Sequence, residues 1–159
     1  MGKVLARQEL LDEVKKLNLQ NKTIGLTNGC FDLLHTGHIK SIEEAKHRCD
    51  YLVVLVNSDT SIKQLKGDTR PIIKEADRTY TLASLVYVDF VCVFNETSPL
   101  KLIELIKPDI YFKGSDYDLN ELPEALAVKS YGGRVENLKL IEGYSTTKLI
   151  DKIRLSCQI

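Results

Sequence analysis

The run of residues from 51 to 56 is the feature that most limits the folds open to this chain. Its sequence, Tyr-Leu-Val-Val-Leu-Val, is apolar throughout. A strand with two apolar faces is typical of a parallel sheet that is covered by helices on both sides. Strand-like and helix-like apolar patterns alternate along the rest of the chain. This alternation predicts an α/β fold.

The predicted elements fill most of the 159 residues. We expect strands at 23–27, 51–56, 88–94, 110–113 and 134–140, and helices at 5–17, 37–48, 75–85, 99–106, 121–131 and 145–155. Right-handed crossovers then predict a Rossmann-like, doubly wound parallel sheet with helices on both faces. The length suits a single domain, with 1–21 as a leading helix and 22–159 as the domain proper. In such sheets, ligands bind at the carboxyl ends of the strands.

Composition excludes several classes of function. Lys plus Arg and Asp plus Glu each number 22, so we expect neither nucleic acid nor an anionic membrane as a partner. No apolar run approaches a membrane span, and the first residues lack the core of a signal peptide. Four scattered cysteines without a C-x-x-C pattern are typical of free thiols. We therefore expect a cytoplasmic protein.

A His-x-Gly-His unit at 35–38 carries the strongest chemical signal. It follows the strand at 23–27 and begins the helix at 37–48, where free backbone N–H groups favour an anion. His35 and His38 can share one face of the first turn, and Gly37 lets the backbone approach a ligand. The unit predicts a triphosphate site. Two ordinary histidines remain an alternative, as does a zinc site that adds Cys30 or Asp32.

Two further segments could contact phosphates. Ser145 or Thr146 opens the last helix, either as a simple N-cap or as a phosphate ligand. The segment 57–71 carries basic residues and little apolar content. It is expected to be a mobile loop that closes over phosphates, or else merely a solvated loop.

Two other positions are less specific. Arg78 lies on a predicted helix and either faces the cleft or lies on the surface. The segment 113–117 follows a predicted strand and either contacts a base or sugar, or forms a turn. No Ser-His-Asp set, carboxylate pair or P-loop is present, so phosphate binding is the recurring theme.

Two motifs in this order resemble the nucleotidyltransferases of the cytidylyltransferase-like superfamily. They are Gly-x-Phe-Asp-x-x-His-x-Gly-His at 29–38 and Ser-Thr-Thr-Lys at 145–148, and the resemblance runs from about residue 22 to 153. Within the superfamily the chain is most similar to the D-glycero-D-manno-heptose 1-phosphate adenylyltransferases, through 27–32, 57–59, 65–71, 113–117 and 145–147. Glycerol-3-phosphate cytidylyltransferases usually carry Tyr-Gly-Thr-Phe-Asp at the first motif. They also have arginines where this chain has Val86 and Leu140.

The resemblance implies a role for each matched residue. The residues implied in catalysis, through the phosphates and the departing pyrophosphate, are His35, His38, Lys63, Lys66 and Arg78. Those implied in nucleotide binding are Asn28, Gly29, Cys30, Phe31, Gly37, Lys113, Gly114, Asp116, Ser145, Thr146 and Thr147. Those implied in substrate binding are Asp32, Asn57, Asp59 and Arg70. No metal held by the protein is implied, and Mg²⁺ would arrive on the nucleotide.

The implied reaction joins an NTP, expected to be ATP, to a sugar 1-phosphate, expected to be D-glycero-D-manno-heptose 1-phosphate. It yields an NDP-sugar and pyrophosphate. The resemblance also implies a homodimer and a separate sugar kinase. Alternatives are a cytidylyltransferase for glycerol 3-phosphate or another polyol or phosphonate, an FAD synthetase, and a non-catalytic nucleotide sensor. A fragment related to class I aminoacyl-tRNA synthetases is disfavoured by the neutral charge.

Overall fold

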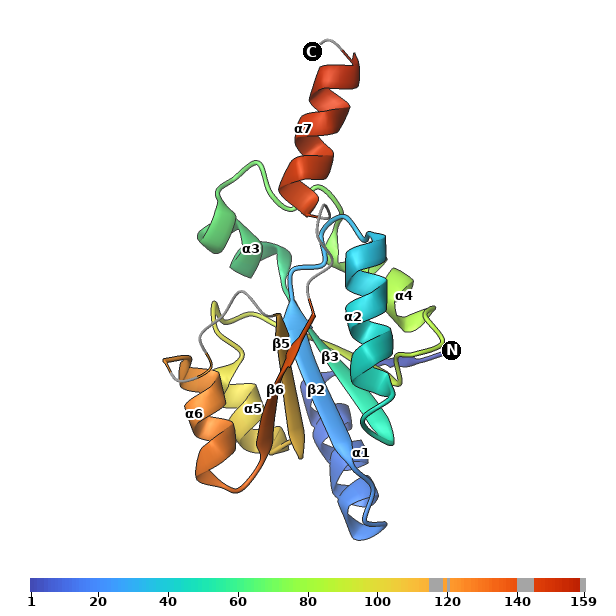
Figure 1. The fold of residues 1–159 in the computed structure, drawn as a ribbon, viewed down its shortest axis with the longest axis vertical. Helices are drawn as coiled ribbons and strands as arrows, with labels where there is room; N and C mark the ends of the chain where they lie inside the picture. Colours follow the sequence, from blue (N-terminus) through green and yellow to red (C-terminus); the bar gives the residue numbers. More distant parts are fainter. Residues whose placement is uncertain (115–118, 120, 140–144, 158–159) are drawn as a thin grey trace.

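The computed structural model describes residues 1–114, 119, 121–139 and 145–157. The described chain forms one six-stranded sheet in which every strand pair is parallel (Figure 1). The sheet order is β1-β4-β3-β2-β5-β6. The strands are β1 (Lys3–Val4), β2 (Ile24–Gly29), β3 (Tyr51–Asn57), β4 (Phe90–Phe94), β5 (Ile110–Gly114) and β6 (Arg134–Leu138).

The described residues form seven helices. They are α1 (Arg7–Leu19), α2 (Thr36–Lys46), α3 (Asp59–Lys66), α4 (Glu75–Ala83), α5 (Leu100–Ile106), α6 (Pro123–Ser130) and α7 (Thr146–Cys157). Their alternation with the strands confirms the predicted α/β, Rossmann-like architecture.

The strand order reverses at β2. From β2 the chain builds outward through β3 and β4, then returns to add β5 and β6 on the other side. Gly25 of β2 accordingly pairs with Leu52 of β3 and with Ile110 of β5. The two connections leave the sheet in opposite directions at the carboxyl ends of β2 and β5. This is the place where doubly wound sheets bind ligands.

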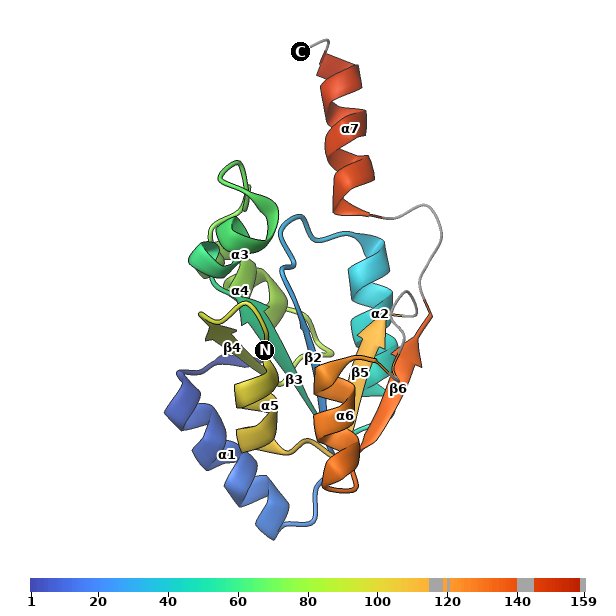
Figure 2. The ribbon, with the colours of Figure 1, turned by 90° about the vertical axis from the view of Figure 1, so that its left-hand side faces the viewer.

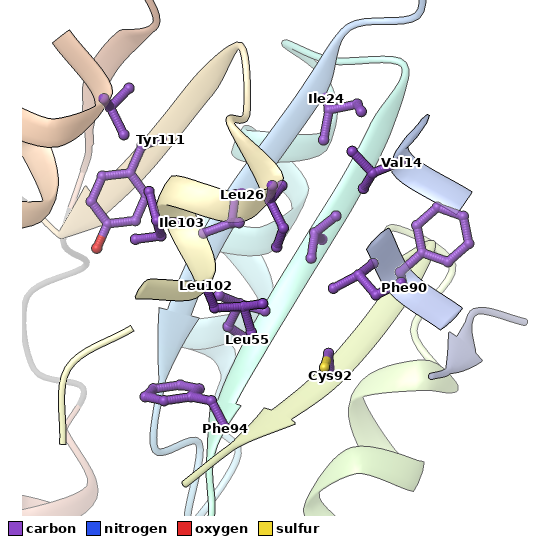
Figure 3. Close-up of a cluster of buried hydrophobic side chains, with 14 of the residues drawn as sticks. Val14, Ile24, Leu26, Leu55, Phe90, Cys92, Phe94, Leu102, Ile103 and Tyr111 are labelled. Carbon is purple, nitrogen blue, oxygen red and sulfur yellow. The ribbon is translucent and has the colours of Figure 1, made fainter. Parts of the chain in front are cut away.

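Both faces of the sheet are covered, as the apolar run in β3 predicts. Figure 3 shows one core, in which α1 and α5 pack on side chains such as Leu26, Leu55 and Tyr111. The second core lies on the other face, where α2 and α4 cover Val54 and Val56. Alternate residues of β3 therefore enter opposite cores, and no face of this strand is left for solvent.

The structure corrects the prediction of a mobile loop over 57–71. Residues Asp59–Lys66 form helix α3, which begins where the Ser58 hydroxyl accepts a hydrogen bond from the Ser61 N–H at 3.1 Å. Ile62 is fully buried and anchors the helix. The loop prediction was wrong here because one serine cap and one buried isoleucine stabilise a helix that has a mostly polar sequence.

Two further elements complete the sheet and its surroundings. The two-residue strand β1, too short to be found from periodicity, pairs with β4 at the sheet edge. Residues 1–21 thus supply an edge strand as well as the expected helix. Helix α7 extends away from the body beyond the carboxyl ends of the strands (Figures 1 and 2). Among the described helices, none is both long and apolar enough to cross a bilayer.

Candidate active site

The two histidines of the motif meet at the start of α2. His35 is the N-cap, and its Nδ1 accepts a hydrogen bond from the His38 N–H at 3.4 Å. The two imidazole rings stack, with centroids 3.8 Å apart and planes 17° from parallel. Both rings therefore lie beside the first turn of α2, whose free N–H groups attract an anion.

His38 is held as a neutral imidazole. Burial, followed by the charges of His35 and Lys66, lowers its pKa to about 4. Its Nδ1 atom is buried and has no hydrogen-bond partner among the described residues. A buried nitrogen without a partner is costly. This nitrogen, near the start of α2, thus needs a partner that the described side chains do not supply.

A strained residue supports the ring of His38. Phe31 has φ of +46°, a conformation uncommon for a bulky side chain. Its ring meets His38 edge to face, with centroids 5.3 Å apart. Gly29 makes room for this ring, because a Cβ atom there would lie 3.1 Å from Phe31 Cε2.

A cavity of about 500 Å³ opens at the carboxyl ends of β2, β3 and β5. Eight of the residues singled out from the sequence or lying beside them in a motif line it: Thr27, Asn28, Gly29, Cys30, Asn57, Lys66, Lys113 and Gly114. The topology thus brings residues from four separate segments to one space. Its described lining also includes Leu65, Thr97, Pro99, Leu122 and Glu124.

Two asparagines in this cavity have fixed orientations. Asn28 Oδ1 accepts hydrogen bonds from the Tyr111 hydroxyl at 2.6 Å and from Lys113 Nζ at 3.2 Å. Asn57 Nδ2 donates to Ser61 Oγ at 2.9 Å, and Asn57 Oδ1 accepts from the Cys30 thiol. Both side chains are held before any substrate arrives.

The guanidinium of Arg78 joins three connections of the fold. It donates to the backbone oxygens of Cys30 at 2.6 Å, Asn57 at 2.9 Å and Ile73 at 2.9 Å. It also forms an ion pair with Asp59 at 2.7 Å, and its side chain has no exposed surface. This donor set faces the protein itself, which favours a positioning role over the phosphate contact expected from the sequence.

Asp32 and Arg70 form a second internal pair. Asp32 Oδ2 lies 2.6 Å from Arg70 Nε, and the Asp32 side chain is 1 % exposed. Asp32 Oδ1 accepts the backbone N–H groups of Ile72 and Ile73 at 2.8 and 2.9 Å. The carboxylate therefore closes the segment between α3 and α4 onto the end of β2. This internal pairing favours a positioning role for Asp32 and Arg70 over the substrate contact that the resemblance implies.

The remaining predicted residues do not line this cavity among the described residues. Lys63 is exposed on α3, and Gly37 lies in the first turn of α2. Ser145 Oγ accepts from the Lys148 N–H at 3.1 Å, as an N-cap does, while Thr146 and Thr147 begin α7. Leu149 lines a smaller cavity with Phe31 and Leu34, which brings the start of α7 beside the β2–α2 connection. Asp116 lies outside the described residues.

Sequence reasoning missed several residues of this site. Tyr111 on β5 and Ser61 on the unexpected helix α3 bond to the lining residues Asn28 and Asn57. Glu124 on α6 lines the cavity itself. No local motif marks them. Tyr111 gives a weak signal, because a phenol inside an apolar strand needs a hydrogen-bond partner when it is buried.

The charges around the site suit an anion. Lys66 and Lys113 line the cavity with a single carboxylate, Glu124, among the described residues, whereas the carboxylates of Asp32 and Asp59 are already paired with arginines. Within the described part of the chain, no group of three or more His, Cys, Asp or Glu side chains is arranged to hold a metal ion. The two lysines and the N-terminus of α2 form a donor set that suits a phosphate ligand.

Comparison with known proteins agrees with this geometry. The model of the cytidylyltransferase-like family matches residues 26–152, which include the histidine motif and the start of α7. The chain belongs to the cytidylyltransferase-like family. The superfamily predicted from the two motifs is thereby confirmed, and with it a nucleotidyltransferase domain.

Curated relatives of this cytidylyltransferase-like chain are longer proteins. It is 47 % identical over 151 residues to the "Bifunctional protein HldE" of Koribacter versatilis, a match that covers 95 % of this chain and 31 % of that protein. The protein of the same name from Helicobacter pylori is 45 % identical over 155 residues, with 98 % and 32 % covered. The chain thus spans about a third of the length of these relatives.

Two solved structures share the fold of this family member. A lipopolysaccharide core biosynthesis protein from Thermoplasma volcanium matches with a TM-score of 0.63 and 31 % identity, over 78 % of this chain and 99 % of that one. A pantoate-beta-alanine ligase from Francisella tularensis has the same TM-score at 18 % identity, over 87 % and 67 %. The second likeness is one of fold alone.

Proposed function

We propose that the chain transfers the adenylyl group of ATP to a sugar 1-phosphate, D-glycero-D-manno-heptose 1-phosphate, and releases pyrophosphate. The observation that carries this proposal is the stacked pair of His35 and His38 at the N-terminus of α2, where Nδ1 of His38 is buried and no described residue bonds to it. A phosphate oxygen at that place receives an N–H donor from the imidazole and the positive end of the helix dipole.

The chemistry requires little proton transfer. A phosphate monoester has its second pKa near ~6, so its oxygen is already an anionic nucleophile at neutral pH. This oxygen forms a bond to the α-phosphorus while the bond to the bridging oxygen breaks, and the electron pair leaves with pyrophosphate. The protein must align the two groups and stabilise the crowded anionic charge. No paired carboxylates are needed for that task.

The contacts suggest how the work is divided. We assign His35 and His38 to the α- and β-phosphates, and Lys66 and Lys63 to the charge that develops on pyrophosphate. Lys66 is already close enough to lower the pKa of His38. Ser145, Thr146 and Thr147 would take the β- and γ-phosphates at the start of α7.

Other residues position these groups. We assign Arg78, with Asp59, and Asp32, with Arg70, to hold the connections after β2 and β3 in place. Asn28, Gly29, Cys30, Phe31, Gly37, Lys113 and Gly114 remain proposed nucleotide contacts, and Asn57 remains a proposed acceptor contact. Asp116 keeps its proposed role at the base or ribose.

A divalent metal ion generally accompanies the nucleotide in nucleotidyltransferases. We propose Mg²⁺, bound through the phosphates of ATP, because the described side chains include no cluster that could hold the ion alone. Bound there, the ion would neutralise charge on the departing pyrophosphate.

The choice of acceptor rests on similarity. The sequence segments that favour a heptose phosphate are supported by relatives named HldE and by a neighbour named for lipopolysaccharide core biosynthesis. Those relatives are called bifunctional, and the chain spans about a third of them. The resemblance supports two further proposals: a separate kinase supplies the sugar 1-phosphate, and the reaction takes place in the cytoplasm.

We further propose a homodimer. Helix α7 leaves Ile153 half exposed and Leu155 82 % exposed. A second copy that covers this helix would bury both side chains. Light scattering across a concentration series tests this directly, and a monomer at every concentration would contradict it.

Pyrophosphate release from a panel of nucleotides and acceptors tests the proposed reaction. We expect the highest kcat/KM with ATP and D-glycero-D-manno-heptose 1-phosphate, and lower values with CTP or with glycerol 3-phosphate. Faster turnover of CTP with a polyol phosphate would replace the acceptor assignment. Tight ATP binding without pyrophosphate release from any acceptor would indicate a nucleotide sensor instead.

A further inference from the structure

One acidic side chain lines the cavity at the carboxyl ends of β2, β3 and β5. Glu124, in the first turn of α6, is 7 % exposed and shares this cavity with Lys66 and Lys113. It is the only carboxylate among the described residues that line the cavity. A carboxylate repels phosphate, so the phosphate chemistry of the site gives no reason for its presence.

The orientation of Glu124 is fixed by a neighbouring serine. Ser98 Oγ donates a hydrogen bond to Glu124 Oε1 at 2.6 Å, and it accepts one from the Leu100 N–H at 3.2 Å. The only hydroxyl proton of Ser98 is thus directed at the carboxylate. An ionised carboxylate offers about four lone-pair sites, so Glu124 keeps capacity to accept further hydrogen bonds.

The segment that holds Glu124 also holds Asn57. The Asn57 amide donates to Ser61 Oγ, whose proton is donated to the backbone oxygen of Glu96 at 2.8 Å. Glu96 is two residues before Ser98. One short connection after β4 therefore fixes two polar side chains, Asn57 and Glu124, on the lining of one cavity.

Helix stability alone does not account for this arrangement. A carboxylate in the first turn of α6 interacts favourably with the helix dipole, but that effect is small and needs no burial. Glu121, three residues earlier, is exposed and offers a similar charge near the same helix end. The buried position of Glu124 on a cavity wall is thus better explained by a ligand.

We propose that Glu124 binds hydroxyl groups of the acceptor, as a carboxylate that accepts hydrogen bonds from a vicinal diol, with Asn57 as a second contact. This inference rests on the proposed function and adds a specificity determinant to it. The ribose of the nucleotide has the same chemistry. Residues proposed to contact the nucleotide, such as Asn28 and Lys113, line the same cavity, so both substrates would meet there. We assign Glu124 to the acceptor, because the connection that orients Glu124 also orients Asn57, the proposed acceptor contact.

Glu124→Gln is the test variant, because glutamine keeps the shape and still accepts from Ser98 but lacks the charge. Glu121→Gln is the matched control. We expect the KM of the sugar 1-phosphate to rise at least about 10-fold in Glu124→Gln, as a hydrogen bond to a charged group is weakened. The KM of ATP and the melting temperature should match the control. An acceptor that lacks the contacted hydroxyl should lose affinity for the wild type but not for Glu124→Gln.

Three results would overturn the proposal. Equal acceptor KM values for Glu124→Gln and Glu121→Gln would remove Glu124 from the substrate site. A rise in the KM of ATP alone, accompanied by a wild-type penalty for 2′-deoxy- or 3′-deoxy-ATP that the variant lacks, would place the diol on the ribose. A deoxy-acceptor penalty that persists in Glu124→Gln would assign the contact to another residue.

Failure of the proposed function has a different signature, because the wild type would then release no pyrophosphate with any sugar phosphate. In that case calorimetric titration with the sugar 1-phosphate and with inorganic phosphate replaces the kinetics. A wild-type preference for the sugar ester that disappears in Glu124→Gln supports the hydroxyl site. The same preference in both proteins, or in neither, overturns it.

Discussion

The rings of His35 and His38 stack 3.8 Å apart beside the N-terminus of α2, and burial, with the charges of His35 and Lys66, lowers the pKa of His38 and keeps it neutral. Two imidazolium rings at that distance would repel each other and would also be opposed by the helix dipole. The protonation state of the pair should therefore respond to nearby negative charge. Anionic phosphates favour the protonated form that the free protein disfavours.

Protonation of His38 should depend on bound nucleotide. Its pKa in the free protein is about 4, below the usual 6.5, because of burial first and the charges of His35 and Lys66 next. A bound triphosphate raises that pKa, so binding should take up protons between about pH 4 and 6.5. Calorimetry of ATP binding in buffers of different ionisation enthalpy measures this uptake. Identical enthalpies in all buffers at pH 5.5 would contradict it.

Folding stability should also follow this titration. The unfolded chain binds more protons than the native one between about pH 6.5 and 4, because the folded pKa of His38 is depressed. The contribution of neutral His38 to the free energy of unfolding is fully present above pH 6.5 and is lost as the pH falls toward 4. Urea unfolding of wild type and His38→Ala at pH 7 and pH 4.5 isolates it. The variant should lose less stability than the wild type over that range.

Removal of the His38 ring should affect catalysis more than folding. We expect His38→Ala to lower kcat by roughly 10²- to 10³-fold, the usual effect of deleting one group that stabilises transition-state charge. Nδ1 makes no described hydrogen bond within the protein, so unfolding free energy should change by only about 1 kcal/mol. His47→Ala, at the exposed end of α2, is the control. Near-normal turnover by His38→Ala would exclude the proposed role.

Lys66 should act on both the pKa of His38 and on catalysis. Lys66→Ala removes a positive charge that lowers this pKa, so the pKa should rise while kcat/KM falls. Lys63→Ala should also lower kcat/KM without moving the pKa of His38. NMR titration of the imidazole and steady-state kinetics separate the two effects. Unchanged kinetics for Lys66→Ala would make it a surface residue.

Arg78 should be needed for stability as well as activity. Arg78→Ala leaves three backbone oxygens and the Asp59 carboxylate without their donor. We expect the free energy of unfolding to fall by about 3–5 kcal/mol, the typical cost of breaking a buried charged cluster. Arg134→Ala, with an exposed side chain and a 3.9 Å ion pair, should change stability by less than about 0.5 kcal/mol. Equal urea midpoints for both variants would contradict the positioning role.

Local sequence patterns predicted the architecture well because the spacing of apolar residues reflects which faces of each strand and helix are buried. The apolar run of β3 required cover on both faces, and the order of strands and helices required parallel crossovers. Helix α3 was missed because its stability depends on the Ser58 cap and on Ile62 inside a polar segment. Strand β1 was missed because two residues carry no period.

The site was predictable only where its residues are close in sequence. The histidine motif lies within one turn and the preceding loop, so its spacing alone indicated the geometry. The contacts of Arg78 join residues up to 48 positions apart, and those of Asp32 reach 41 positions. Such contacts depend on the folded sheet. Tyr111 and Glu124 likewise become site residues only through tertiary packing.

The hydrogen bonds of Arg78 couple three connections of the fold to one another. The ends of β2 and β3 and the turn before α4 all bind the same guanidinium. Fluctuation of one of them removes a partner from the other two, so they should open and close in concert. The free energy of binding a ligand at one connection then includes the cost of ordering the other two. If the proposed function holds, we expect nucleotide and acceptor to bind with synergy that needs no domain movement.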